Sequence, residues 1–366
     1  IRAMYVRRTT YGDAAEPAVR HVVALPVANS ADGRGLPLDD PDAGWPIFGV
    51  DETRDLDRAE LQIDAGLVLA SPLLLLREGE RRVRITFTMD DGDRDRLTTV
   101  IREFRAYAES QLDVPMSSAV FAGILSDVLL VAVSGPNGYV DVKDYALTAD
   151  DSAPDELHLE FTRGVTDPPM CAPLDATQSM LPPGSAPSVR IRLNPDARVY
   201  AFSWFARLVI TRVRIDASVR GLRSLSLTGP QGPVATDAPF PVFGLIPERG
   251  SYLIFGNEEL WNKPLARVQL HIEWANLPQE PETIATHYAA YRLNTTSDVF
   301  KLRCSVLDGY RWRLLGTRPD LPLEEAATVP CFPRSASTNG APTTHATWEW
   351  PLRGLELRGQ GAGVAP

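Results

Sequence analysis

The chain has 366 residues, of which 44% are hydrophobic and 23% charged, and its 47 acidic side chains against 37 basic ones give a net charge of −10. This composition is that of a folded globular protein, and the length exceeds what one ordinary core organises, so we expect two or three units. The negative charge repels phosphate backbones and no Lys/Arg stripe offsets it, which disfavours nucleic acid as a partner.

Membrane insertion and secretion are not indicated either. The longest apolar run, 66–76, is interrupted by Ser71 and Pro72 and is shorter than the roughly 18 residues of a membrane span. The first residues, 1–6, show no basic region leading into an apolar core and no initiator Met, so we expect no signal peptide, and the chain fits a portion of a longer protein. An odd number of widely spaced cysteines predicts neither a disulfide framework nor a zinc site, and a cytoplasmic location is expected.

Proline usage sets the fold class. The 31 prolines outnumber the 26 glycines and lie throughout the chain, which disfavours long helices and favours short strands joined by rigid turns. We therefore expect a mainly β protein of several β-sandwich-like units, with one amphipathic helix and Pro-rich connections.

The first two segments in chain order are an arm and a β-rich unit. Residues 1–57 are rich in Pro, Gly and Asp and lack periodic apolar spacing, so they are expected to form an extended N-terminal arm. Residues 58–166 are expected to form the first β-rich unit. Within it, 61–76 and 82–87 predict a hairpin, because apolar and polar side chains alternate in the second run.

A helix is predicted in the same unit near 95–112. Apolar residues recur there at three- and four-residue spacing, and charges occupy the other side. Further strands are predicted at 128–133, at 139–142 across a Gly-Pro-Asn-Gly turn, and at 157–161. The helix is expected to cover a sheet.

The second half begins with a break. Six prolines in 167–187 predict a Pro-rich connection, since such a stretch cannot hold a strand ladder. Residues 188–320 are expected to form a second β-rich unit, and 321–366 an irregular tail. Strands predicted in this unit are 189–193, 208–219, 222–227, 252–255, 267–274 and 299–307.

Motifs for catalysis or metal binding are absent from the sequence. Neither Gly-x-Ser-x-Gly nor His-Glu-x-x-His occurs, and the five histidines lie in separate segments. The acidic run 90–95 lacks the calcium-loop spacing and predicts a solvated turn that caps the following helix. We expect a protein that is not an enzyme, with no catalytic residues, no cofactor and no metal.

Aromatic residues crowd one region of the second unit. They are Trp261, Trp274, Tyr288, Tyr291, Tyr310 and Trp312. Such a cluster is compatible with core packing, with a protein interface, or with a platform on which a sugar stacks. A carbohydrate-binding or carbohydrate-active β-sandwich module is therefore the alternative hypothesis.

One passage has a sequence pattern that is too specific to result from the overall composition. It reads Pro-Phe-Pro-Val-Phe-Gly at 239–244, continues through 246–260, and leads by Lys263-Pro264-Leu265 into 268–274 and Leu277-Pro278. This passage resembles the large baseplate J-like wedge proteins of extracellular contractile injection systems, the antifeeding-prophage and virulence-cassette type. Further matching segments are 29–33, 44–49, 70–73 and 78–81 upstream, and 287–291, 300–302 and 309–312 downstream. The resemblance covers residues 25 to 315, except near 95–120 and 167–187.

The resemblance implies a structural subunit. Such proteins pair as wedges, six wedges surround a central spike and hub, and the ring couples the baseplate to sheath contraction. Expected partners are other wedge subunits, spike and hub proteins and sheath-proximal proteins, in a six-fold hetero-oligomer that assembles in the cytoplasm. Rigid Pro and Gly turns and packing aromatics would hold the shape. The candidate structural and interface residues are Trp45, Phe48, Phe240, Phe243, Gly244, Gly250, Gly256, Trp261, Trp274, Tyr288, Tyr291 and Trp312.

Overall fold

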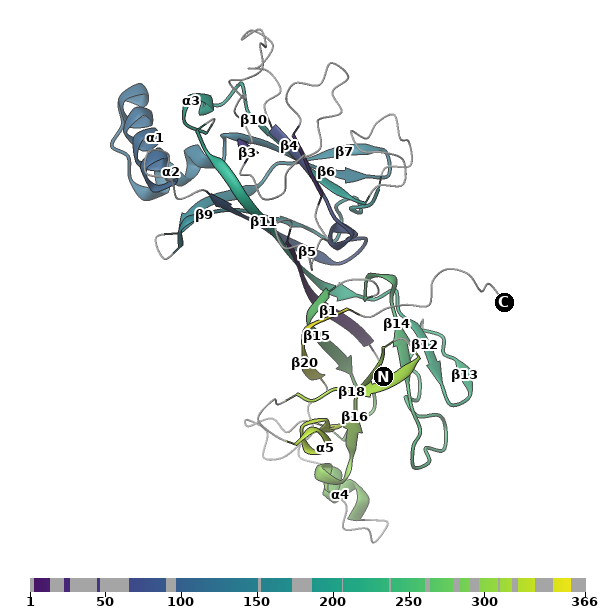
Figure 1. The fold of residues 1–366 in the computed structure, drawn as a ribbon. Helices are drawn as coiled ribbons and strands as arrows, with labels where there is room; N and C mark the ends of the chain where they lie inside the picture. The colour runs from purple at the N-terminus through teal and green to yellow at the C-terminus, as the bar shows by residue number, and fades with distance from the viewer. Residues whose placement is uncertain are drawn as a thin grey trace. The chain divides into compact units, whose positions relative to one another are not determined.

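The computed structural model divides the chain into two compact units (Figure 1). Unit 1 comprises Ile1–Thr10 with Val219–Pro366, and unit 2 comprises Tyr11–Ser218. The residues that the structure describes are 3–13, 23–26, 45–46, 66–89, 97–150, 153–172, 186–205, 207–236, 238–260, 264–278, 283–289, 296–308, 310–317, 322–332 and 345–356. Antiparallel strands are the commonest element of these residues and helices are few, which confirms the predicted mainly β fold.

Unit 2 contains two sheets. The first orders β11 (Val209–Leu222), β5 (Glu80–Met89), β9 (Ala153–Arg163) and β8 (Tyr145–Asp150), with β3 (Trp45–Pro46) also paired to β11. The second orders β2 (Val23–Pro26), β4 (Gly66–Ala70), β10 (Ser188–Leu193), β6 (Leu129–Gly135) and β7 (Gly138–Val142). This arrangement gives the sandwich-like unit that the sequence predicts.

Period-2 patterning explains the core of the first sheet. Buried Val83 and Ile85 of β5 lie opposite Phe161 and Leu159 of β9. Arg82 and Arg84 are on the other face, where both donate hydrogen bonds to the Glu160 carboxylate. Burial raises the pKa of Glu160, but hydrogen bonds and charge from the two arginines outweigh it, so the net pKa is lowered.

The predicted hairpin of 61–76 with 82–87 is wrong. β4 pairs with β2 and β10, whereas β5 pairs with β9, so the two runs belong to different sheets. A 3-10 turn, η2 (Pro72–Leu74), lies between them and is capped by Ser71, whose Oγ accepts from the Leu73 amide. The buried apolar residues of either run would suit either sheet, so their patterns carry no information on which strand each run joins.

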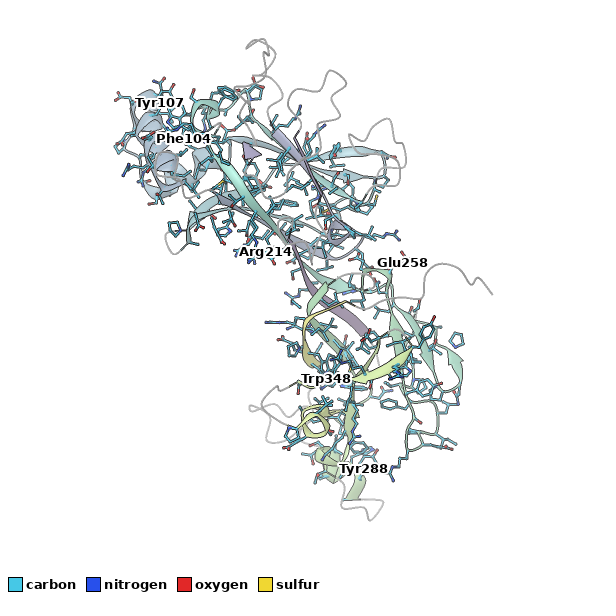
Figure 2. All side chains as sticks on the ribbon, in the orientation of Figure 1. Phe104, Tyr107, Arg214, Glu258, Tyr288 and Trp348 are labelled. Atoms are coloured by element: carbon cyan, nitrogen blue, oxygen red, sulfur yellow. The ribbon has the colours of Figure 1, made fainter. Side chains whose placement is uncertain are left out.

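Two helices cover the first sheet. The predicted helix is confirmed as α1 (Leu97–Leu112), which contacts β8 and β9, and α2 (Ser118–Leu125), which the sequence analysis missed, contacts β8 (Figure 1). The buried Phe104 of α1, labelled in Figure 2, meets Phe205 of α3 (Phe202–Phe205) edge to face, with ring centroids 5.9 Å apart. The apolar stripe of α1 is thus anchored by aromatic packing.

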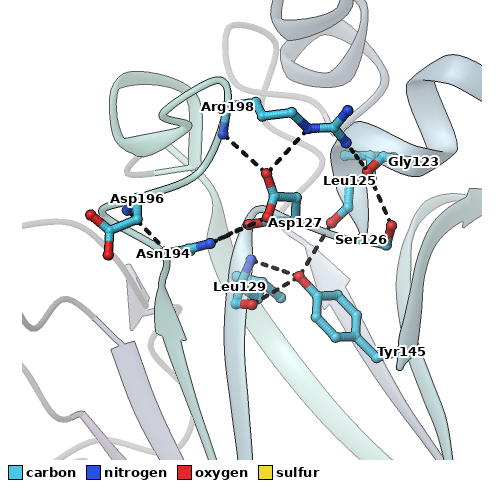
Figure 3. Close-up of polar contacts among 9 residues, drawn as sticks. All are labelled: Gly123, Leu125, Ser126, Asp127, Leu129, Tyr145, Asn194, Asp196 and Arg198. Carbon is cyan, nitrogen blue, oxygen red and sulfur yellow. Dashed lines mark hydrogen bonds and ion pairs between the residues drawn. The ribbon is translucent and has the colours of Figure 1, made fainter. Parts of the chain in front are cut away.

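A polar network ties α2 to the strands beside it (Figure 3). Asp127 follows α2, and its Oδ2 accepts from the Arg198 amide at 3.0 Å. The Tyr145 hydroxyl accepts from the Leu129 amide at 2.7 Å and donates to the Leu129 carbonyl at 2.9 Å. Burial is the largest cause that raises the pKa of Tyr145, so this hydroxyl keeps its proton and can donate.

The first residues of the predicted Pro-rich connection form hydrogen bonds with the rest of unit 2. Arg81 is fully buried, and its guanidinium donates to the carbonyls of Pro168 at 3.0 Å and Asp167 at 2.9 Å. Leu76 and Met170 exchange backbone hydrogen bonds. Residues 173–185 lie outside the described residues. The division between units falls instead at residues 218 and 219, inside β11, because this long strand contributes residues to both units.

Unit 1 is built from several groups of paired strands. In the largest, β15 (Pro264–Glu273) pairs on one side with β1 (Ala3–Asp13) and on the other with β20 (His345–Glu356). β12 (Ser226–Gly229) lies between β13 (Gly232–Pro233) and β14 (Ile254–Gly256). The two-stranded pairs are β16 (Lys301–Arg303) with β19 (Thr328–Pro330), and β17 (Ser305–Asp308) with β18 (Arg311–Leu314). Short helical turns are η4 (Glu258–Leu260), α4 (Ile284–Ala289), η5 (Ser297–Val299) and α5 (Leu323–Ala326).

Both ends of the chain differ from the expectation. The expected arm at 1–57 includes β1, and the expected irregular tail at 321–366 includes β20. Each strand is fixed by pairing with β15, a partner distant in sequence. In the described part of the chain, no helix is long and apolar enough to cross a bilayer.

Candidate functional site

The candidate site is an apolar groove in unit 1, with a volume of about 940 Å³. Its floor is one face of the β15/β20 pair and consists of Leu270, Ile272, Trp348 and Trp350. The register places Leu270 opposite Trp348, which Figure 2 labels, and all four floor residues are buried. Alternation along both strands sends polar side chains such as Gln269 and Glu349 to the other face, as in a strand pair that buries one side.

One wall comes from the Pro- and Gly-rich passage before β14. Val242, Phe243 and residues 247–255 line the groove there. Gly250 has a φ of 91°, a conformation that side-chain-bearing residues rarely adopt, and the Ser251 amide donates to the Glu248 carbonyl at 3.0 Å. The turn therefore follows from the Glu-Arg-Gly-Ser sequence.

The other wall consists of β16 and the residues beside it. Lys301, Leu302, Arg303, Cys304 and Ser305 line the groove. Trp312 of β18 also lines it, although 55% of its surface is exposed. Trp348 joins this wall to the floor, because its indole Nε1 donates to the Pro330 carbonyl at 3.1 Å.

The rim of the groove is positively charged on an acidic protein. Arg249, Lys301 and Arg303 are exposed lining residues, whereas Glu248 is the one carboxylate among the described residues that line the groove. Arg311 and Arg313 follow on β18, and Arg313 lies 3.8 Å from Asp308. The local excess of cations gives the groove a positive charge, whereas the net charge of the whole chain is negative.

Exposed apolar side chains are concentrated in the same unit. Nine of the fourteen exposed large hydrophobic side chains among the described residues belong to unit 1, although unit 2 is the larger unit. They are Leu245, Ile246, Tyr252, Ile254, Val299, Leu307, Tyr310, Trp312 and Leu323. Three of them, Tyr252, Ile254 and Trp312, come together in the lining of the groove. Contiguous exposed apolar surface is uncommon on monomeric proteins and marks interaction sites.

Three of the residues singled out from the sequence meet in the groove. Phe243 and Gly250 are in one wall and Trp312 is in the other. Gly244 has a φ of 85° beside Gln231, and Gly256 ends β14. Phe240 is half-buried in the segment that leads into the first wall.

Two other candidates belong to a row of aromatic rings. Trp274 is buried and contacts Phe332 at 5.2 Å between ring centroids. Phe332 then meets Phe300 at 5.5 Å, and Phe300 meets Tyr288 at 6.1 Å. Trp274 is buried and the other three rings are half-buried, and none of the four lines the groove.

The remaining candidates are Trp45, Phe48, Trp261 and Tyr291. Trp45 is in β3 and pairs with Ile210. Phe48, Trp261 and Tyr291 lie outside the described residues.

The sequence analysis missed Trp348 and Trp350, which form half of the floor. The signal is the alternation of Ala346, Trp348, Trp350 and Leu352, which has the period of a strand with one buried face. Prolines in the flanking sequence obscured this pattern.

The described side chains of unit 1 include two cysteine thiols. Burial raises the pKa of the Cys304 and Cys331 thiols to about 12, which disfavours a nucleophilic thiolate at neutral pH. Within the described residues, no group of three or more His, Cys, Asp or Glu side chains could hold a metal ion. His271 Nδ1 lies 2.8 Å from Thr347 Oγ1, a cross-strand contact on the polar face of β15.

No protein-family model matches the chain, and no curated protein matches it as a relative.

Proposed function

We propose that the chain is a structural, non-enzymatic subunit of a large assembly, namely a baseplate-wedge subunit of a phage-tail-like contractile injection system. The apolar lining of the groove of unit 1, which includes the exposed Tyr252, Ile254 and Trp312, carries the assembly role. Such a surface favours association with a partner, because the partner removes its apolar area from water.

The wedge assignment is supported by the residues that carry the resemblance. Residues 239–256 contribute the first wall, and 268–274 contribute to the floor. The resembling passage and the groove are therefore largely the same part of the chain.

The proposed role needs no bond chemistry. The subunit would pair with other wedge subunits, join the ring around the spike and hub, and couple that ring to sheath contraction. A rigid β-sheet with an apolar groove on one face suits a subunit that must exchange one set of partner contacts for another when the ring rearranges.

Purification of contractile particles from the native host tests the proposal. We expect the chain to co-purify with sheath and tube proteins and to lie at one end of the particle in negative-stain images. Recovery only as a free protein, from a host fraction that contains intact particles, would contradict the wedge role.

A carbohydrate-binding module is the second candidate, because Trp312 and Tyr310 are exposed neighbours, with 55% and 86% of their surfaces accessible. Exposed rings can stack on sugars. Cleavage would need two carboxylates at about 5 to 10 Å, and Glu248 is the one carboxylate in the described lining, so binding alone is favoured. Glycan-array binding that Trp312→Ala abolishes would favour this candidate over the wedge.

A further inference from the structure

We propose that the groove of unit 1 binds an extended segment of a partner subunit in which apolar side chains alternate with acidic ones. This inference rests on the proposed function and adds to it the chemistry and conformation of the segment that the partner inserts.

The floor of the groove requires an apolar occupant. Leu270 and Ile272 from one strand and Trp348 and Trp350 from its neighbour form a continuous hydrophobic surface.

The strands that line the groove favour an extended occupant. β14 is the edge strand of its sheet, and β16 has β19 as its one strand partner in the described part of the chain. An edge strand presents unpaired backbone groups that a further strand can join, which is a common mode of peptide recognition.

Charge selects an acidic segment. Lys301 and Arg303 are exposed on β16, separated by the half-buried Leu302, and Arg249 is exposed in the opposite wall. A strand beside β16 would share this period of two, so its apolar residues would face the floor while its alternate residues faced the two cations. Carboxylates at those positions complement the rim, and a basic segment would be repelled.

A peptide experiment tests the chemistry on the full chain. The probe is a fluorescein-labelled eight-residue peptide, Asp-Leu-Glu-Ile-Asp-Trp-Glu-Leu, and its counterpart has Lys at the four acidic positions. Fluorescence anisotropy should show the acidic peptide binding about tenfold tighter than the basic one. Equal binding, tighter binding of the basic peptide, or no binding of either would overturn the proposal.

Charge reversal localises that preference. The double variant Lys301→Glu/Arg303→Glu should lose the preference for the acidic peptide or invert it. The matched control is Arg102→Glu/Lys143→Glu, because both residues are exposed cations of unit 2. An equal loss in the control would show a net-charge effect and would overturn the groove as the binding site.

Photocrosslinking in particles identifies the partner. The photoreactive residue p-benzoylphenylalanine replaces Tyr252 of the groove wall in one strain and exposed Val165 of unit 2 in another. We expect a crosslink from position 252 to an acidic and apolar segment of one particle subunit, with none to that segment from position 165. Co-purification without this crosslink would overturn the groove proposal and leave the wedge role intact. Acidic-peptide binding by a chain that is absent from particles would instead retain the groove and overturn the wedge role.

Discussion

The indole of Trp274 packs edge-on against the ring of Phe332, with centroids 5.2 Å apart and 61° between the planes. The contact joins the residue that follows β15 to the residues that follow β19. Together with Phe300 and Tyr288, it holds the small sheets of unit 1 to one another by aromatic packing.

Trp274→Ala should lower the free energy of unfolding by about 3 to 5 kcal/mol, the usual cost of removing a large buried side chain. Urea denaturation of the full chain measures this loss. Trp312→Ala is the matched control: because Trp312 is exposed in the absence of a partner, we expect a change within about 0.5 kcal/mol. If Trp274→Ala retains stability but prevents assembly, Trp274 belongs to an interface.

Tyr145→Phe should destabilise unit 2 by about 1 to 3 kcal/mol, because the variant leaves the Leu129 amide without its hydroxyl partner. The aromatic ring is retained, so the loss reports the hydrogen bonds alone. Thermal unfolding followed by circular dichroism is the measurement, with Tyr107→Phe at an exposed ring as control. Equal effects of the two substitutions would contradict the role of the network in Figure 3.

Gly66→Ala and Gly123→Ala should change stability in opposite directions. A Cβ at Gly66 of β4 would meet the backbone of β10, with the Arg192 Cα 2.8 Å away, so the strand pair would have to separate. A Cβ at Gly123 of α2 meets nothing within 4 Å, and Ala in a helix is favoured over Gly by about 1 kcal/mol. Hydrogen exchange of β10 amides should rise only in the first variant; protection in both would contradict the register at Gly66.

Alkaline pH should weaken unit 1 through its buried thiols. Burial raises the pKa of Cys331 from its ordinary value of 9.0 to about 12. The folded thiol therefore binds its proton more tightly than the unfolded one, and this contribution is complete below pH 9 and is lost as pH rises from 9 to 12. In that window the free energy of unfolding should fall by up to about 1.4 kcal/mol per pH unit for a single group.

Urea denaturation at pH 8 and pH 10.5 separates the contribution of the Cys331 thiol to stability from other effects of alkaline pH. Cys331→Ala should lower stability at pH 8 but should show a shallower decline between the two pH values than the unchanged chain. An identical decline in both proteins would mean that Cys331 does not titrate with the raised pKa.

The sequence predicted those elements whose signals are local. The stripe of Leu97, Phe104 and Ala108 identified α1, and the Gly-Pro-Asn-Gly turn identified the hairpin of β6 and β7. The sequence did not predict which strands pair with each other. β4 and β5 are consecutive strands that belong to different sheets, and the apolar residues of either strand would suit either sheet.

The walls of the groove were likewise predicted from local signals, whereas its floor was not. Phe243, Gly250 and Trp312 were identified because turn chemistry and exposed aromatics are visible in short windows of sequence. Trp348 and Trp350 reach the groove only because β20 pairs with β15 across many intervening residues. Such non-local pairing has no signature in either strand alone.

Unit 2 is inserted within unit 1, since the chain contributes residues 1–10 to unit 1, completes unit 2, and returns at residue 219. On the ribosome, all of unit 2 emerges before β15, the strand that pairs with β1 through the register of Ala3 with Glu273. Domains generally fold as units during synthesis, so the first strand must wait for β15 while unit 2 folds behind it. The groove is therefore among the last features of the chain to form, and a nascent chain that stalls before β20 has no groove to offer a partner.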